Sequence, residues 1–492
     1  MKFFIFILTF FLFFQSCMKG KKVDLVIHNA KIYTVDQNFS IHEAIAIKNG
    51  KIVEIGPERQ ILNKYRSDET IDVNGKEIYP GFTDSHGHLL ELVNQRLNLD
   101  LTKTKSFEEV LFRLEKYASK TKRRFIVGKG WDETLWESKE LPKNEKLNKL
   151  FADIPVLLIH SNNHIALIND CLLKKAKLNP NTSNGIISDK DISIIKKFIP
   201  EFSSNEKEKI LLQIQEELFQ YGITSVHEVG INHDDIKLFE SLIYKRKLYL
   251  NIYAMLHPSE ENLNFAAKNG IYKNKNLMIR SFIIGDKAFH EFPPISAIDS
   301  KKIAHLCKNT NYQMNLTANK DSINNILEII TETFKLKKDH RWRIENMESL
   351  QMNFIKQLIS NGAFPSLEIL NNPNNQTSSY KSILDKAGFF ALGSNFPHRS
   401  FDPFLTINHL EKSKNNQKEE SVSFQNCIMG MTIWSAFASF QEKKIGSLEK
   451  NKDATFVIFE FPIQSNKILS ERGQTNFAFM TFIKGKKVYS AE

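Results

Sequence analysis

Two histidines at alternate positions, His86 and His88, are the residues of this chain with the clearest capacity for metal chemistry. They follow a Pro80-Gly81 turn and Asp84 within the segment PGFTDSHGH. Alternate side chains of a β-strand lie on one face, so both imidazoles can reach a single ion. Imidazole is a common ligand of zinc and other transition metals. The segment therefore predicts a metal site at the end of a strand.

Both ends of the chain carry short strand patterns. The expected strands are residues 23–27, 31–35, 44–48, 51–55 and 453–459, and residues 481–489 are expected to form another hairpin. Asn49-Gly50 joins two of them and favours a two-residue hairpin turn. Because neither end has enough strands for a stable sheet, we expect one β-sandwich built from both ends, with a large domain inserted between them.

Strand-like apolar runs alternate with helical segments between the two ends. The expected strands are residues 155–159, 223–226, 248–255, 278–284, 312–317, 342–345 and 389–393. Helices are expected at residues 207–221 and 321–334. Repeated β-then-α units indicate an α/β protein with a parallel barrel or an open parallel sheet.

Further short segments occur in a fixed order and strengthen the metal-site interpretation as a set. They are Gly128–Asp132 (GKGWD), Ile154–Val156 with His164 and Asn169, Gly222–Glu228 (GITSVHE), Arg343–Glu345 (RIE), Gly393–Pro397 (GSNFP) and Lys452–Ala454 (KDA). Together with PGFTDSHGH they resemble the amidohydrolase superfamily, and within it amidohydrolase family 3, the N-substituted formamide deformylase-like branch. The resemblance extends over residues 23–490 and implies a TIM-like (β/α)8 barrel carrying the β-sandwich.

The resemblance also implies a divalent-metal site, with zinc as the expected ion, at the C-terminal mouth of the barrel. His86 and His88 match the two metal ligands of the first strand. A lysine or its equivalent is expected from a middle strand, and one histidine from each of the next two strands. An aspartate of the last strand is expected to take the proton from the metal-bound water.

This chain departs from the pattern at the remaining positions. Thr317 and Asn346 stand where the two later histidines are expected, and Asn395 stands where the catalytic aspartate is expected. No lysine is in register at residues 280–286, and Lys287 is out of register. Neutral oxygens are poor zinc ligands, and an amide cannot accept a proton as a carboxylate can. The substitutions therefore predict a degenerate, catalytically inactive site.

Other groups are available near the predicted mouth. Asp286 and His398 are the candidates for a substitute ligand set, although simple loss of ligands is the preferred interpretation. His164 contacts a substrate or is a hydrogen-bonded loop histidine. Trp131 and Asp132 line the substrate pocket or are a packed tryptophan beside a hydrogen-bonded aspartate.

Two functions follow from these residues. The resemblance implies a metal-dependent hydrolase of carbon–nitrogen bonds other than peptide bonds, in which the ion activates water and polarises an amide carbonyl. The substitutions favour a membrane-anchored pseudoenzyme that keeps the pocket and binds a small molecule or a partner.

The N-terminus predicts export. Met1-Lys2 is a short positive start, and residues 3–14 form an almost wholly apolar run that fits a signal peptide better than a membrane-spanning helix. Cys17 follows in a sequence that resembles a relaxed bacterial lipobox; the alternative is a secretory signal with an incidental cysteine. Met18 rather than Asp follows, so the outer membrane is the expected location.

Charge and cysteine content exclude other classes. The net charge of +11 suits an anionic membrane surface, but the basic residues are dispersed among acids and form no DNA-reading motif, so no nucleic-acid partner is expected. The 4 cysteines are widely spaced and imply no disulfide framework.

The expected organisation has six parts. They are residues 1–16, the signal peptide; 17–22, the lipid anchor and tether; 23–79, the first part of the β-sandwich; 80–405, the barrel with an insertion after its first strand; 406–440, the end of the barrel and a connection; and 441–492, the second part of the β-sandwich.

Overall fold

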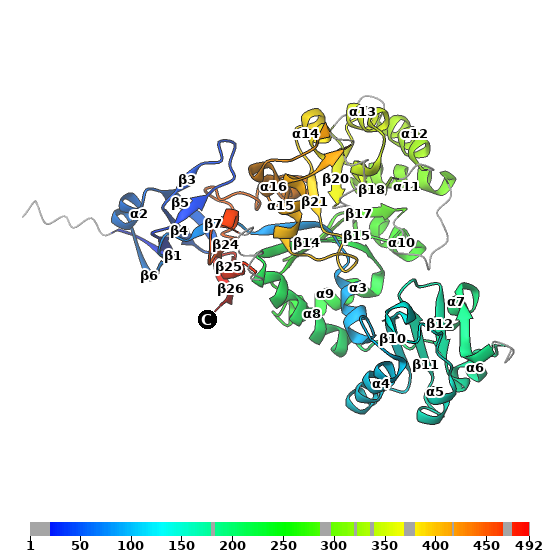
Figure 1. Cartoon of the computed structure of the whole chain (residues 1–492). Coiled ribbons are helices and arrows are strands. Elements are labelled where there is room, and N and C mark those ends of the chain that lie inside the picture. The colour runs from blue at the N-terminus through cyan, green and yellow to red at the C-terminus, as the bar shows by residue number, and fades with distance from the viewer. Residues whose placement is uncertain are drawn as a thin grey trace, which may run out of the picture.

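The computed structural model has a barrel, a region of sheets beside it, and a separate lobe (Figure 1). It describes residues 20–178, 183–285, 297–318, 322–334, 339–368, 379–415, 418–465 and 475–491. Cys17 and Asp286, two of the candidate residues, lie outside these ranges, as do the expected signal peptide and Lys287. Among the described residues, no helix has the length and apolar character needed to cross a membrane.

Eight parallel strands form the barrel, which confirms the TIM-like α/β fold. In order they are β8 (Phe82–Gly87), β14 (Ile223–Ile231), β15 (Asn251–Leu256), β17 (Leu277–Ile284), β18 (Gln313–Thr317), β19 (Arg343–Glu345), β20 (Phe364–Glu368) and β21 (Ala391–Gly393). The residues just after the last strand meet the end of the first strand. There, the Asn395 amide donates to the His86 carbonyl, and the His88 amide donates to the Phe396 carbonyl, both at 2.8 Å.

Two differences from the sequence-based strands concern the barrel. β20 was not expected, because Pro365 within it lacks the N–H that a central strand uses for pairing. The expected strand at residues 155–159 does form, as β11 (Val156–His160), but it belongs to the insertion. Its residues are all buried, so its sequence resembles that of a barrel strand.

Helices connect the barrel strands and cover the barrel. They are α8 (Ser204–Gln220), α9 (His233–Tyr244), α10 (Glu260–Asn269), α11 (Ala297–Thr310), α12 (Ile323–Phe334), α13 (Met352–Ser360), α14 (Tyr380–Ala387), α15 (Pro403–Glu411), α16 (Phe424–Gly430) and α17 (Ile433–Ala438). In α8, Ser203 and Glu206 form a capping box, which satisfies N–H groups at the start of the helix. The buried residues Leu211, Ile214 and Leu218 follow at helical spacing and join the barrel core.

The two ends of the chain meet in sheets beside the barrel, as expected, and Figure 1 shows the blue and red segments side by side. One sheet has the order β5 (Lys51–Gly56), β4 (Ala44–Lys48), β1 (Lys21–His28), β6 (Tyr65–Asp72). The other has the order β26 (Lys486–Ser490), β25 (Ala478–Ile483), β24 (Phe456–Phe459), β7 (Glu77–Pro80), β2 (Lys31–Tyr33), β3 (Ile41–His42). Asn49 and Gly50 both have positive φ, at 52° and 71°, as the predicted hairpin turn requires.

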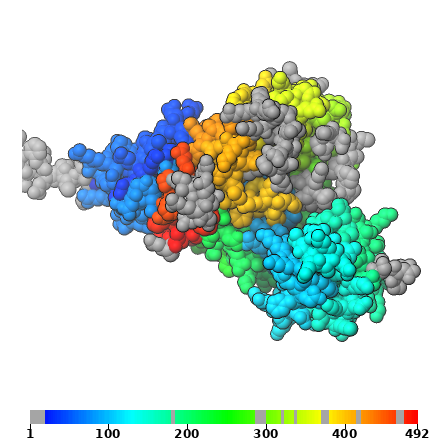
Figure 2. All heavy atoms as spheres, in the orientation of Figure 1, coloured from blue at the N-terminus to red at the C-terminus, as the bar shows by residue number. Residues whose placement is uncertain are grey.

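The insertion follows α3 (Leu89–Leu97) and forms a separate lobe, cyan to teal in Figures 1 and 2. Its strands are β9 (Leu99–Asp100), β10 (Ile126–Trp131), β11, β12 (Ile165–Ile168) and β13 (Ile186–Ser188); its helices are α4 (Phe107–Thr121), α5 (Glu145–Leu150), α6 (Asp170–Ala176) and α7 (Asp189–Lys196). A core of its own includes Leu114, Trp131 and Leu158. The lobe therefore packs around its own apolar residues.

Candidate active site

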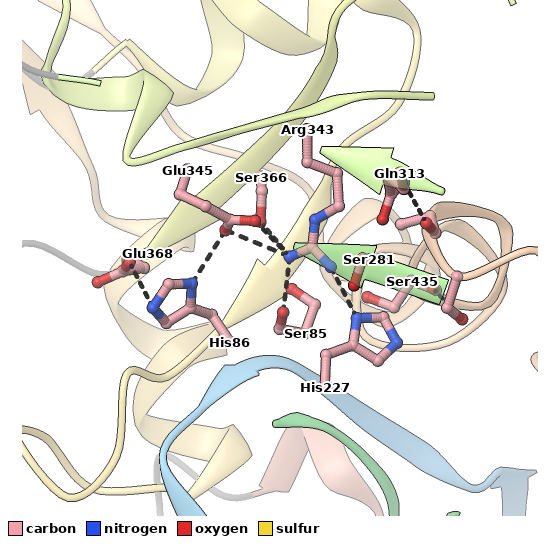
Figure 3. Close-up of polar contacts among 12 residues, drawn as sticks. Ser85, His86, His227, Ser281, Gln313, Arg343, Glu345, Ser366, Glu368 and Ser435 are labelled. Carbon is pink, nitrogen blue, oxygen red and sulfur yellow. Dashed lines mark hydrogen bonds and ion pairs between the residues drawn. The ribbon is translucent and has the colours of Figure 1, made fainter. Parts of the chain in front are cut away.

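His86, at the end of β8, lies between two buried carboxylates (Figure 3). Its Nδ1 is 3.0 Å from Glu345 Oε2, and its Nε2 is 3.6 Å from Glu368 Oε1. Burial alone would raise the pKa of Glu345, but the Arg343 guanidinium and His86 hold that pKa below its ordinary value. An ionised carboxylate only accepts hydrogen bonds. His86 Nδ1 is therefore the protonated ring nitrogen, and its N–H donates a hydrogen bond to Glu345. A histidine oriented in this way by a carboxylate is typical of metal ligands.

Arg343 is fully buried at the centre of the barrel and holds this arrangement together. Its Nη2 donates to the Ser85 carbonyl at 2.6 Å and to Ser366 Oγ at 2.8 Å, and also pairs with Glu345. Its Nη1 donates to His227 Nδ1 at 2.9 Å. Burial and the Arg343 charge lower the pKa of His227 well below its ordinary value, so His227 is neutral. The polar network fixes Glu345, which in turn fixes His86.

Glu368, at the end of β20, is held by two asparagine amides. Asn395 Nδ2 donates to Oε2 at 2.6 Å. When its amide is oriented to satisfy the hydrogen bonds, Asn346 donates to both carboxylate oxygens, at 3.1 and 2.5 Å. Burial raises the pKa of Glu368. Asn346 and Asn395, which stand at expected functional positions, thus both donate to Glu368. The sequence interpretation did not include this carboxylate.

A further buried carboxylate lies beside Glu368. Glu348 Oε2 accepts the backbone N–H of Glu368 at 3.4 Å. Burial and the neighbouring Glu368 charge raise the pKa of Glu348 well above its ordinary value. Two buried carboxylates that repel each other electrostatically favour the uptake of a proton or a cation.

His88 and Thr317 lie near this centre, and His398 lies at its edge. The buried His88 ring is 5.3 Å from the His86 ring and 5.6 Å from the exposed His398 ring, centroid to centroid. Thr317 is in register with Glu345 on the neighbouring strand, so both side chains lie on the same side of the barrel sheet. Thr317 Oγ1 is buried and has no hydrogen-bond partner within the described ranges.

Glu228 fixes the helix that follows His88. Its carboxylate accepts the N–H groups of Leu89 and Leu90, at 2.6 and 2.9 Å. These are the first N–H groups of α3, which have no partner inside the helix. Glu228 therefore caps α3, whereas the preceding residue, His227, belongs to the Arg343 network.

The candidate pocket residues of the insertion have contacts inside their own lobe. Trp131 is buried and donates to the Leu158 carbonyl at 2.9 Å. Asp132 Oδ1 accepts the Thr134 N–H at 3.0 Å. His164 is exposed and pairs with Asp189 at 3.1 Å. These contacts fit the structural alternatives for all three candidates: a packed tryptophan, a hydrogen-bonded aspartate and a hydrogen-bonded loop histidine.

The insertion also holds a group of possible metal ligands among the described residues. The ligand atoms of Asp132, Glu133 and His160 all lie within 4.8 Å of one another. His160 Nε2 contacts Glu133 Oε2 at 2.8 Å, and Asp132 caps the short helix that follows it. These contacts account for the group without an ion.

The donors around His86 fit a divalent ion, although with a set that the resemblance did not imply. His86, His88 and Glu368 provide two imidazoles and one carboxylate, a combination used by zinc enzymes. Among the described residues, these three do not bring their ligand atoms within 4.8 Å of one another, so binding requires at least one side chain to turn inward.

Glu368 is the candidate ligand that sequence reasoning missed. Its strand was not expected, and Pro365 is the reason. The signal that pointed to it is the short, largely apolar run Ala363–Glu368, which ends in an acidic residue and lies between two helical patterns.

Comparisons with known proteins agree with this architecture. The sequence pattern described as "Amidohydrolase family" matches residues 69–489. The chain is 22% identical over 511 residues to the protein LONG AFTER FAR-RED 3 of Arabidopsis thaliana, which covers 89% of this chain and 87% of that protein.

Solved structures share the fold. An uncharacterized metal-dependent hydrolase from Pyrococcus furiosus superposes with a TM-score of 0.75 at 20% identity, over 89% of this chain and 99% of that chain. An adenosine deaminase from Xanthomonas campestris with bound zinc superposes with a TM-score of 0.60 at 12% identity, over 96% of this chain and 94% of that chain.

Proposed function

The chain belongs to the amidohydrolase family, and we propose on that premise that it is a metal-dependent hydrolase of a carbon–nitrogen bond, other than a peptide bond, in a small molecule. One observation carries the proposal. His86 is held at Nδ1 by Glu345, while its Nε2 faces the Glu368 carboxylate. An imidazole fixed in this way is prepared to bind a metal through its second nitrogen.

Each side chain of the site has a separate role in the proposed reaction. A bound divalent ion would supply a water of lowered pKa and polarise the carbonyl of the substrate. His86 and His88 hold the ion, and Glu345 and Arg343 orient His86. The Asn395 amide cannot accept a proton. The Glu368 carboxylate, to which Asn395 donates a hydrogen bond, can accept one.

A second candidate is a binding protein without catalytic activity. Neutral side chains at three positions favour it, namely Thr317, Asn346 and Asn395. Such a protein would keep the barrel and bind a small molecule or a partner.

Metal content decides first between the two candidates. The chain from Met18 onward would be purified and analysed by mass spectrometry, first as isolated and then after loading with zinc or manganese. The hydrolase proposal expects about one ion per chain, and loss of that ion in His86→Ala. Failure to retain any ion under either condition would rule the hydrolase out.

Activity is the second test. The loaded protein would be offered N-formyl and N-acetyl amines, which are open-chain amides, and aminopurine nucleosides, whose exocyclic amine is released by deamination. Release of amine or ammonia by the parent and not by His86→Ala is the expected result. A protein that binds the ion and a member of the panel but leaves the compound unchanged would support the binding protein.

We also propose that the chain is exported and anchored by a lipid at Cys17, in the outer membrane. The support is the sequence alone: a short apolar run followed by Cys17 and Met18.

A further inference from the structure

We infer that Glu368 is the carboxylate ligand of the cation centre, in place of the residue at position 395. The inference rests on the proposed function, because it requires the same metal centre. It concerns a residue from the seventh barrel strand, β20, whereas the expected aspartate position follows the eighth, β21.

The first support is the position of the carboxylate. Glu368 is in register with Gly393 on the adjacent strand, two residues before Asn395. The Asn395 amide donates to Glu368 Oε2 at 2.6 Å, so a carboxylate oxygen lies one hydrogen bond from the side chain that replaces the aspartate. A carboxylate is therefore present in the site, one strand away from the expected position.

The second support is the contact between Glu368 and His86. The 3.6 Å from Oε1 to Nε2 is too long for a good hydrogen bond. Two ligands of a tetrahedral zinc, each about 2.05 Å from the ion, lie about 3.4 Å apart. With Nδ1 donating to Glu345, Nε2 is the ring nitrogen that faces the Glu368 carboxylate, and a cation placed between Nε2 and Oε1 would be bound by both atoms.

The third support is the balance of buried charge. Glu345 is paired with Arg343. Within the part of the chain that the structure describes, neither Glu348 nor Glu368 has a lysine or arginine nitrogen within 4.0 Å, and the His86 ring is the basic group nearest to Glu368. The Arg399 charge offsets part of the cost of burying both carboxylates, although it lies beyond that distance. Because buried carboxylates without a close lysine or arginine are costly, a divalent ion would compensate them further.

The fourth support is a neutral oxygen from β18. Thr317 Oγ1 is buried without a hydrogen-bond partner among the described residues, beside Glu345 in register. A buried hydroxyl usually has a partner. An ion or its bound water at the Glu368 centre would provide one.

The test moves the carboxylate between the two strands. Glu368→Gln removes the charge and keeps the shape, and the double variant Glu368→Gln/Asn395→Asp returns a carboxylate to position 395. Each chelator-treated protein would be titrated calorimetrically with zinc, and with cobalt(II) followed by visible absorption. Glu420→Gln is the matched control, because Glu420 is also a buried carboxylate but accepts hydrogen bonds from Ser382.

We expect Glu368→Gln to bind zinc at least 100-fold more weakly than the parent and to change the cobalt spectrum. The double variant should recover at least 10-fold of the lost affinity, and Glu420→Gln should bind as the parent does. Zinc affinity in Glu368→Gln equal to that of the parent would overturn the inference and leave the proposed function standing. A parent chain that binds neither zinc, cobalt nor manganese would overturn both.

Folding is checked on the same samples. Circular dichroism and the metal-free melting temperature should be similar for the parent and Glu368→Gln, because glutamine keeps the volume and removes a buried charge. If Glu368→Gln does not fold, Glu368→Asp takes its place in the titration. Its shorter side chain should weaken binding, and parent-like affinity together with a parent-like cobalt spectrum would count against Glu368 as a ligand.

Discussion

Glu345 accepts a hydrogen bond from His86 Nδ1 at 3.0 Å across the barrel, and the same carboxylate is paired with the buried Arg343. One side chain thus orients the proposed metal ligand and neutralises the guanidinium at the centre of the barrel. Orientation of the metal and stability of the barrel are therefore coupled through Glu345.

Glu345→Gln tests this coupling. Breaking a buried ion pair leaves an uncompensated charge, so we expect a loss of about 3–5 kcal/mol in the free energy of unfolding, measured in urea. Zinc affinity should fall by about 10–100-fold because His86 loses its orienting carboxylate. Glu217→Gln is the control: its partner Arg96 lies at the surface, so a loss below about 1 kcal/mol is expected. Equal effects of the two substitutions would refute the role of Glu345.

Gly393→Ala tests the close approach of the last barrel strand to the first. A Cβ at Gly393 would lie 2.6 Å from the His86 backbone nitrogen and 2.9 Å from its Cα. Since backbone cannot easily move away, we expect a loss of at least about 1–3 kcal/mol in stability and weaker zinc binding. At Gly56 the nearest atom would be 3.9 Å away, so Gly56→Ala should alter neither property. If Gly393→Ala is as stable as the parent and binds zinc equally well, the last strand does not approach the His86 backbone as closely as these distances indicate.

Glu228 gives the stability a defined dependence on pH. Burial raises its pKa from 4.5 to about 8, although the Leu89 and Leu90 N–H groups act in the opposite direction. The folded protein then holds a proton that the unfolded chain has lost, so this contribution to stability is complete below pH 4.5 and is lost as the pH rises through about 8. Urea unfolding of the chelator-treated protein across this range should show the decline.

The matched variant is Glu228→Gln, which does not titrate. It should be less stable than the parent at low pH, because its amide N–H₂ faces an N–H group of α3, but its stability should change less between pH 5 and 8 (roughly the span between the two pKa values). A slope identical to that of the parent would assign the pH dependence to other groups.

Cys17→Ser tests the proposed lipid anchor. Without a thiol at the processing site no lipid can be attached, so the exported variant should move from the membrane fraction to the soluble fraction. Cys171→Ser, which changes a free cysteine of the insertion, should remain with membranes. Retention of a lipid-modified Cys17→Ser in the membrane fraction would disprove the assignment.

The sequence by itself determined that His86 and His88 lie together at the end of a strand, because residues two positions apart stay close whatever surrounds them. The structure places His86 in β8 and His88 directly after it, with the ring centroids 5.3 Å apart. The sequence also determined the family, the hairpin at Asn49-Gly50 and most barrel strands. Local residue pattern controls all of these features.

Only the tertiary structure decided what surrounds His86. The sequence shows Asn346 and Asn395 as two losses, and it shows Glu368 as an acid after a proline-containing run. Barrel closure brings all three together, so that both amides bind one carboxylate facing His86. Contacts between strands far apart in the chain depend on register and closure, which no local pattern encodes.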